Sequence, residues 1–348
     1  MEKLGLAWLA APTFRMRRKV DQVVRSYYDR LMREGVDSHE KLLAEERKAL
    51  SHKTDFTRAI ELCVPVVWRS CKCYKLRDSW SVSRGVRSLV STVLDPKMYD
   101  LGITFCLALK SGDIRDEGLD ERESLSEEEF RLRMGVADRL EEFFYDRGKK
   151  IHREGFYRLC KEARDRIWSY EVTDLKNAEA LKRGAFSEIR KNYGKIKECW
   201  HGKTAGIAEK VVMLTLYEGG LLEESPDVAE SIIKYQWFVA NVWMWADEIK
   251  DLDSNIKERT PNRIVIESIK KGLNSVNAED VYRFLRKNLD VIDEPVQEYL
   301  KGVDEVKGEL GEIYWLNFGD YDLGARVILK MLEERRAVLT EKLSSKSV

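Results

Sequence analysis

The sequence predicts an all-α fold, and three observations support that prediction. Apolar residues recur at intervals of three and four along most of the 348 residues, with charged residues between them. Only six prolines interrupt the chain, and alternating strand patterns are missing. No fixed-period repeat or low-complexity linker divides it. We therefore expect a single domain over 1–348, with N-terminal helices in 1–50 and a core over about 55–320.

The apolar pattern predicts individual helices and one long loop. The helices are expected over roughly 14–34, 38–51, 55–70, 78–94, 97–112, 126–147, 153–170, 174–199, 203–218, 227–251, 261–272, 278–288, 292–316 and 321–342. The most polar segment, 113–129, is expected to be a loop. Ser124 or Ser126 is a candidate cap for the helix that follows it.

Composition excludes several classes of partner. Sixty-one basic and sixty-one acidic residues give zero formal charge, so nothing indicates nucleic acid or an anionic membrane. The apolar stretch 4–11 is far too short to span a bilayer, and we expect neither a transmembrane helix nor a cleaved signal. Six cysteines without a CxxC pair indicate free thiols in a reducing cytoplasm rather than a zinc site. The partner is therefore expected in a pocket.

An apolar, aromatic run over 235–246 ends abruptly in carboxylates. If this run is helical, Asp247 and Asp251 lie one turn apart on one face, with Glu248 beside them, and Trp243 continues that face. The two carboxylates repel, and a divalent cation would turn that repulsion into ligation. Hard oxygen ligands suit Mg²⁺. The alternative is a buried helix whose acidic end reaches solvent.

A second apolar run, 99–109, also leads into acids. Asp113 and Glu117 are spaced four residues apart, and so are Asp116 and Asp120. Either pair places two carboxylates on one face if the segment is helical. Alone, such a pair is typical of a solvated helix end. Two apolar helices that each end this way, facing one another across a cavity, could clamp metal ions at its mouth.

Three elements in this order resemble motifs of the trans-prenyl diphosphate synthases, which are all-α class I isoprenoid synthases. Residues 109–117 resemble the first aspartate motif of that family, with Gly112 where the leading Asp stands. Residues 247–251 resemble the second, with Glu248 in place of its second Asp. Between them, 202–206 (Gly-Lys-Thr-Ala-Gly) resemble the Lys-Thr element. The resemblance covers roughly residues 55–260 and implies a helical bundle around a central apolar cavity.

In that family an allylic diphosphate loses its diphosphate and leaves a carbocation, and metal ions neutralise the departing charge. The resemblance implies that Asp113, Asp116 and Glu117 hold Mg²⁺ from one side, and Asp247, Glu248 and Asp251 from the other. It also implies that Lys203 and Thr204 bind the diphosphate, with Lys250 and Lys257 as further cations. Lys203 stands where a helix is expected to begin, and free amides there would also favour an anion. For each lysine, an ordinary surface role is the alternative.

The element that holds isopentenyl diphosphate in the family should fall near 70–78. Lys72, Lys75 and Arg77 make this segment basic, but both glycines and the proline of the element are missing, so a solvated face is the alternative. Trp243 is a candidate lining residue for the carbocation through cation–π attraction. Phe105 lies two turns, about 12 Å, before Asp113 and is a candidate for the floor of the cavity that limits chain length.

Three functions stay open. The first is prenyl transfer, in which an allylic isoprenyl diphosphate is elongated with isopentenyl diphosphate. The second is a terpene synthase, a cyclase or lyase that uses one isoprenyl diphosphate; the missing co-substrate motif and nine tryptophans favour it. The third is a non-catalytic subunit that pairs with another prenyltransferase, for which Gly112 would mark lost metal binding. A homodimer or hetero-oligomer is expected by analogy only.

Overall fold

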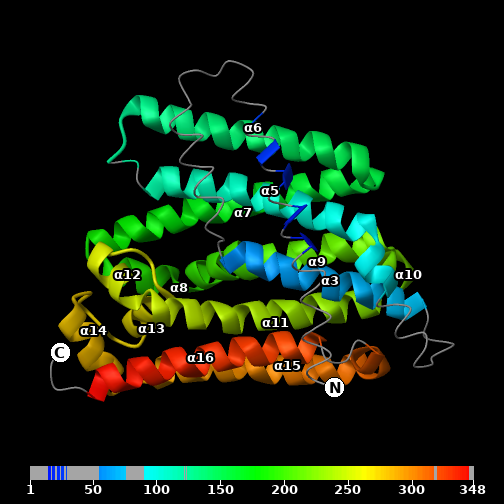
Figure 1. Ribbon diagram of the computed structural model, residues 1–348. Coiled ribbons are helices and arrows are strands. Elements are labelled where there is room, and N and C mark those ends of the chain that lie inside the picture. The colour runs from blue at the N-terminus through cyan, green and yellow to red at the C-terminus, as the bar shows by residue number, and fades with distance from the viewer. Residues whose placement is uncertain are drawn as a thin grey trace. The chain divides into compact units, whose positions relative to one another are not determined.

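The computed structural model describes residues 55–75, 90–120, 122, 124–316 and 320–344, together with scattered positions between 15 and 29. Within these ranges every regular element is a helix and none is a strand, as Figure 1 shows. The all-α fold class is therefore confirmed. The helix expected over 38–51, most of the one over 78–94, and Arg77 lie outside the described residues.

The chain divides into two compact units that alternate along the sequence. Unit 1 comprises Met1–Leu159, Leu214–Glu224 and Trp315–Asp320, and unit 2 comprises Cys160–Met213, Ser225–Tyr314 and Tyr321–Val348. The single domain stays a prediction, and each unit is described here by itself.

Unit 1 is built on a long helix, α5. Its helical segments are α3 (Asp55–Lys75), α5 (Pro96–Asp120), α6 (Glu127–Ile151), the first turn of α7 (Glu154–Lys182), the end of α9 (Gly206–Gly219) and α10 (Leu221–Glu224). α5 packs along α6 and also against α3 (Figure 1). At Gly102 of α5, an added Cβ would lie 2.2 Å from the sulfur of Met16, so the side chain of Met16 packs directly on the helix backbone there.

The loop expected over 113–129 is wrong for its first half, because α5 continues to Asp120. Ile114 is buried, and Arg115 pairs with Asp138 of α6 at 2.6 Å, so packing against α6 holds the polar turns helical. At the other end of the connection, Ser126 and Glu129 form a capping box: Oγ of Ser126 accepts from the Glu129 amide at 3.2 Å, and the Glu129 carboxylate accepts from the Ser126 amide at 2.9 Å. The predicted cap at Ser126 is confirmed.

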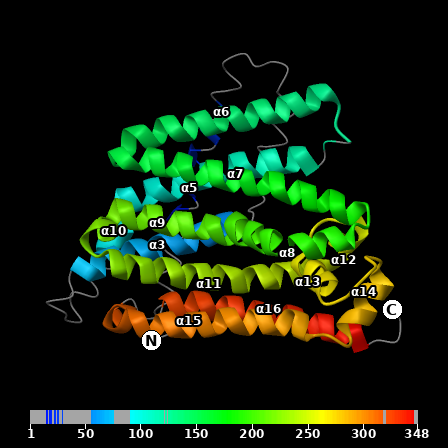
Figure 2. The same cartoon turned by 180° about the vertical axis from the view of Figure 1, so that it is seen from behind.

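Unit 2 contains the remaining helices. These are most of α7, then α8 (Phe186–Trp200), the π-helix η3 (His201–Ala205), the start of α9, α11 (Pro226–Lys250), α12 (Leu252–Glu258), α13 (Arg263–Lys270), α14 (Ala278–Leu285), α15 (Asp290–Leu316) and α16 (Asp320–Ser344). α15 and α16 run alongside α11 in both views (Figures 1 and 2).

Two expected helix breaks are wrong. α7 runs through 171–173 and ends instead at Lys182. Gly184 follows with a φ of +68°, so the amides of Gly184 and Ala185 donate to the carbonyls of Leu181 and Ala180 in a Schellman motif. No break separates 199 from 203 either, because α8 passes through η3 directly into α9. Lys203 therefore does not stand at a helix N-terminus.

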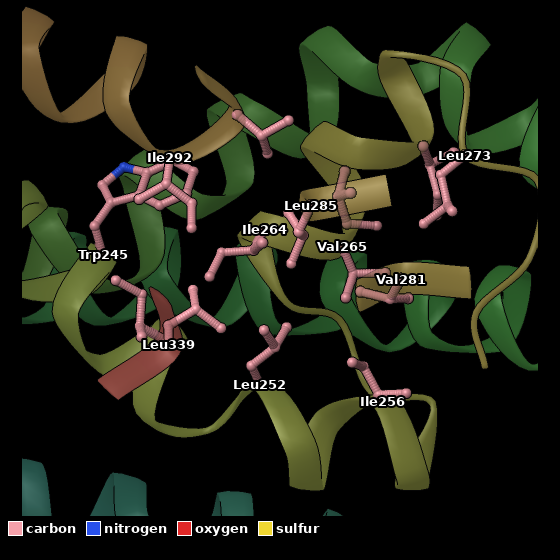
Figure 3. Close-up of a cluster of buried hydrophobic side chains, with 14 of the residues drawn as sticks. Trp245, Leu252, Ile256, Ile264, Val265, Leu273, Val281, Leu285, Ile292 and Leu339 are labelled. Atoms are coloured by element: carbon pink, nitrogen blue, oxygen red, sulfur yellow. The ribbon is translucent and has the colours of Figure 1, made fainter. Parts of the chain in front are cut away.

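The core of unit 2 is centred on α13. Ile264, Val265 and Ile269 are buried almost completely and meet apolar side chains from the flanking elements. Figure 3 shows Trp245 of α11 and Leu252 of α12 in this cluster, together with residues of α14, α15 and α16. Burying α13 on nearly every side fixes the chain that follows the acidic end of α11.

We predict that Asn262, which caps α13, contributes more to the free energy of unfolding than an ordinary helix cap does. Its Oδ1 accepts from the amide of Ile264 at 3.0 Å, and its Nδ2 donates to the carbonyl of Glu248 at 2.9 Å. Asn262→Ala should lower the free energy of unfolding by about 2 kcal/mol, the sum of a lost cap and a buried carbonyl left unpaired. The exposed cap Asn277 of α14 is the matched control, with a cost of about 1 kcal/mol in urea unfolding. Equal costs at the two sites would contradict the prediction.

Candidate functional site

The acidic end of α11 holds two carboxylates one turn apart, as the sequence predicts. The ammonium of Lys250 lies near both of them, 3.4 Å from Oδ1 of Asp247 and 3.6 Å from Oδ1 of Asp251. A second cation, Arg335 of α16, lies 3.3 Å from Asp247. Burial, and next the charge of Asp247, raise the pKa of Asp251, while Lys250 opposes this shift. The pair therefore already attracts positive charge to the position between its carboxylates.

Glu248 occupies a different environment from its two neighbours. Its carboxylate accepts from the backbone amide of Arg263 at 3.0 Å, and Oε1 lies 3.6 Å from the Arg263 guanidinium. Burial raises the pKa of Glu248 to about 7, although Arg263 opposes the shift. The structure thus engages Glu248 with α13, whereas Asp247 and Asp251 face Lys250. Its role as a metal ligand stays a prediction.

Arg263 is a residue of the candidate site that the sequence did not indicate. Its side chain is only 2% exposed. It donates to Oδ1 of Asn241 at 3.2 Å and to the carbonyl of Trp200 at 3.2 Å, in addition to pairing with Glu248. It therefore links the end of α8 to α11 and α13. The one signal in the sequence is an arginine placed at the head of an apolar run, which does not reveal its partners.

The Lys-Thr element lies in the π-helix η3. π-Helices are rare and are frequently found at functional sites. The ring of Tyr170 packs directly on Gly202, where an added Cβ would lie 1.9 Å from the ring, so this close approach requires glycine. Nζ of Lys203 lies 3.3 Å from Oδ2 of Asp174 on α7. Thr204 belongs to the same turn.

Asp174 is the second residue that the sequence did not indicate. Its Oδ2 faces Lys203, and its Oδ1 is buried without a hydrogen-bond partner among the described residues. Its charge also acts on Glu248 and Arg263. Asp174 thus joins the lysine of the Lys-Thr element to the Arg263 network inside unit 2.

In unit 1 the first acidic motif lies on the continuous helix α5. Asp113 and Glu117 are therefore one turn apart, and so are Asp116 and Asp120. Gly112 is exposed, and an added Cβ there would meet nothing within 4 Å. The backbone accordingly has room for the side chain that the motif lacks.

No family model and no curated protein matches the sequence. Among solved structures, the geranylgeranyl pyrophosphate synthetase of the archaeon Geoglobus acetivorans matches with a TM-score of 0.56 at 13% identity, over 92% of this chain and 98% of that one. The chain has the isoprenoid synthase fold of the trans-prenyl diphosphate synthases. A decaprenyl diphosphate synthase from Rhodobacter capsulatus also matches, with a TM-score of 0.49 at 14% identity over 95% of this chain and 99% of that one. The geranylgeranyl pyrophosphate synthetase of Pyrococcus horikoshii gives 0.46 at 12% identity over 96% and 98%. At these identities the likeness shows the fold alone.

In this isoprenoid synthase fold, the basic segment of α3 is neutralised by acids of its own unit. Lys72 pairs with Asp95 at 2.9 Å, and Lys75 pairs with Glu224 at 3.0 Å. A phosphate at this segment would have to displace both carboxylates. Phosphate binding here stays a prediction.

The remaining candidates differ in burial. Phe105 is 4% exposed and packs on Phe156, with ring centroids 6.1 Å apart. Trp243 is half-buried one turn before Asp247, and Lys257 is exposed on α12. Trp243 therefore remains the aromatic best placed relative to the acid pair, whereas Trp245 is in the core.

The acid pair of α11 has the donor chemistry that Mg²⁺ prefers. Mg²⁺ is usually held by one or two carboxylates together with waters and substrate phosphates. Within the part of the chain whose side chains are described, which excludes Asp113, Asp116 and Glu117, no group of three or more His, Cys, Asp or Glu residues is placed to hold a metal. Asp247 and Asp251 supply the two carboxylates that such a magnesium site needs. The ammonium of Lys250 already lies close to both of them, at the position that a cation would take.

We predict that Glu248 and His201 make opposite contributions to the pH dependence of stability. The raised pKa of Glu248 means that the folded state binds more protons than the unfolded state between pH 4.5 and about 7, so its contribution falls as pH rises through this window. Burial, Arg263 and Lys197 lower the pKa of His201 from 6.5 to about 4, so its contribution rises across that range. The two largely cancel between pH 4.5 and 6.5.

Glu248→Gln removes the falling contribution. Its melting temperature should therefore rise more steeply from pH 4.5 to 6.5 than that of the parent, as measured by circular dichroism. In His201→Asn, the melting temperature should instead fall from pH 4.5 to 6.5 relative to that of the parent, because the rising contribution of His201 is removed. Identical slopes in the parent and Glu248→Gln would mean that Glu248 titrates at its ordinary pKa.

Proposed function

We propose that the protein is a class I isoprenoid synthase that promotes Mg²⁺-assisted departure of diphosphate from an allylic isoprenyl diphosphate, and that it transfers the prenyl group to elongate the chain. The observation that carries the proposal is the acid pair of α11, Asp247 and Asp251, at the end of an aromatic helix within an isoprenoid synthase fold. The helical first motif with Asp113 and Glu117 one turn apart supports it. In this proposal Asp116 and Glu248 are further metal ligands.

The proposed roles follow from charge. Bound Mg²⁺ supplies Lewis acidity that neutralises the leaving diphosphate. Asp247 and Asp251 would hold the cation, and Lys203, a compact point charge on a flexible stem, would bind a diphosphate oxygen in place of Asp174. Lys250, which now lies between the two carboxylates, would contact the diphosphate instead, with Thr204 and Lys257 as additional contacts. Trp243 lines the apolar side of the site and stabilises the carbocation by cation–π attraction.

A terpene synthase is the second candidate, and the pairing in α3 favours it. Lys72 and Lys75, the two cations of the element expected to bind isopentenyl diphosphate that the structure describes, are each paired with a carboxylate. A non-catalytic subunit is the third candidate. It is favoured by the contact of Arg335 with Asp247, which neutralises a metal ligand within the protein.

The proposal also covers the cellular location and the oligomeric state of the protein. All six cysteines are free thiols, which supports a reducing cytoplasm as the place of action. No described helix combines the length and apolar character needed to cross a membrane. We infer an isoprenyl diphosphate as the ligand, and a homodimer or a hetero-oligomer with another prenyltransferase subunit as the assembly.

The test is diphosphate release from geranyl, farnesyl and geranylgeranyl diphosphates with Mg²⁺, each with and without isopentenyl diphosphate. We expect release that requires isopentenyl diphosphate and yields longer products. Asp247→Asn should lower the rate about 100-fold, as expected for losing one charged group at a polar transition state. Glu230→Gln, an exposed acid on the same helix, is the matched control and should keep the parental rate.

Release without isopentenyl diphosphate would assign the terpene synthase instead. A folded protein that releases nothing from any of the three diphosphates would assign the non-catalytic subunit. An unchanged rate in Asp247→Asn would remove the α11 pair from the mechanism.

Gly112→Asp should strengthen metal binding at the first motif. The position is exposed with nothing within 4 Å of a Cβ, so the side chain adds a carboxylate without a clash. Asp has a slightly better helix propensity than Gly, so the free energy of unfolding should change by less than about 0.5 kcal/mol. We expect the Mg²⁺ concentration for half-maximal diphosphate release to fall about 10-fold. Gly112→Asn, which has the same shape without the charge, is the control, and an equal effect in both variants would contradict ligation.

A further inference from the structure

Unit 2 contains a cavity of about 410 Å³ that is open to solvent, since Arg166, Gly194 and Glu198 of its lining are exposed. It lies among α7, α8, η3 and α9, and Trp237 of α11 forms part of its wall. Neither Asp247, Asp251 nor Lys203 is among its lining residues. Its volume falls in the range of small-molecule sites.

Glycines create the opening. Gly194, Gly202 and Gly206 all line the cavity. An added Cβ at Gly194 would meet nothing within 4 Å, and one at Gly206 would meet only the carbonyl of His201 at 3.4 Å. Glycine costs about 1 kcal/mol relative to alanine in a helix interior. Packing explains the glycine at 202, which lies against Tyr170, but not the glycine at 194, which leaves space.

The wall of the cavity carries surplus positive charge. Arg166 of α7 and Lys197 of α8 line it, and no carboxylate is paired with either among the side chains that the structure describes. Lys210 also lines it but is paired with Glu209 at 2.6 Å. Glu198 is the remaining acid of the wall. The cavity therefore favours an anion.

Three aromatic rings, those of Tyr170, His201 and Trp237, also line the cavity. The rings of His201 and Trp237 meet edge to face, with centroids 5.1 Å apart. His201 is neutral at pH 7, since burial, Arg263 and Lys197 lower its pKa to about 4. Nε2 of His201 is bonded to the hydroxyl of Tyr299 at 2.8 Å, which fixes the imidazole. A planar hydrocarbon group can pack against these rings without meeting a second charge.

We propose that this cavity binds a small organic anion, with its acidic group between Arg166 and Lys197 and a planar or unsaturated hydrocarbon part against Trp237 and Tyr170. Asp247, Asp251 and Lys203 do not line this site, although Gly202 and Gly206 belong to the same Lys-Thr element as Lys203. An inorganic anion would contact only the two cationic side chains, and an uncharged hydrocarbon would contact only the aromatic rings. Because the cavity presents cations and rings together, it favours a ligand that carries both an anionic group and a hydrocarbon group.

The test is calorimetric titration of the intact protein with 1-naphthyl phosphate in Mg²⁺-free buffer, alongside inorganic phosphate and 1-naphthol. We expect saturable binding of 1-naphthyl phosphate that is at least 10-fold tighter than that of either fragment. Lys197→Gln and Arg166→Gln should each weaken it about fivefold, the order of one exposed ion pair. Lys195→Gln, an exposed lysine of α8 outside the lining, is the matched control.

A second series fills the cavity. Gly194→Ala, Gly194→Leu and Gly194→Phe should weaken binding progressively, with a loss of at least 10-fold for phenylalanine. Gly308→Phe on α15, another helical glycine with nothing within 4 Å of its Cβ, should bind as the parent does. Unchanged binding in Gly194→Leu and Gly194→Phe would overturn the proposal. So would equal affinity for inorganic phosphate and 1-naphthyl phosphate.

Discussion

The buried guanidinium of Arg263 is the interaction on which the candidate site in unit 2 depends. Removing an arginine from water costs several kcal/mol, and only well-placed partners offset that cost. The partners here are Glu248, the Asn241 side chain and the Trp200 carbonyl. They belong to the acidic end of α11, the middle of α11 and the end of α8. One charge therefore holds the second acidic motif and the entry to the π-helix in fixed positions, and the apolar packing around α13 holds the arginine itself.

The side chains proposed to bind Mg²⁺ and diphosphate already pair with oppositely charged side chains of the protein. Asp247 contacts Arg335 and Lys250, and Lys203 contacts Asp174. In the proposed function, Mg²⁺ or a diphosphate would therefore replace an existing partner of these side chains rather than bind a side chain that has no partner. Such an arrangement stabilises the protein without ligand, because no buried charge is left uncompensated. It also weakens the binding of either ligand alone. Metal and diphosphate bound together exchange both sets of partners at once, which favours their joint binding.

The sequence predicts most of the helices because apolar residues recur at helical intervals along it. The helices over 227–251 and 292–316 were predicted within two residues of α11 and α15. The errors have physical causes. The last turns of α5 are polar and resemble a loop, but Arg115 and Ile114 pack them against α6. Pairwise contacts across more than sixty residues, such as that of Arg263 with Trp200, leave no local pattern at all. The acids and the lysine were visible as motifs, whereas the residues that hold them were not.

Those holding residues carry the signature of a site rather than of a core. Oδ1 of Asp174 and Nε of Arg263 are both buried without a hydrogen-bond partner among the described residues, although Nε lies in an ion pair, 3.6 Å from Oε1 of Glu248. An unpaired buried polar atom costs about 1–3 kcal/mol, so a purely structural network would be expected to satisfy or replace it. Both atoms lie in the same cluster, since the charge of Asp174 acts on Arg263 and on Glu248. Apolar side chains of similar volume would remove this cost, and such replacements of buried charges are often neutral or stabilising. The proposed function gives a reason for keeping these charges. If Lys203 moves from Asp174 to a bound anion, the Asp174 carboxylate, which already has an acceptor oxygen without a hydrogen bond, can accept hydrogen bonds from other donors.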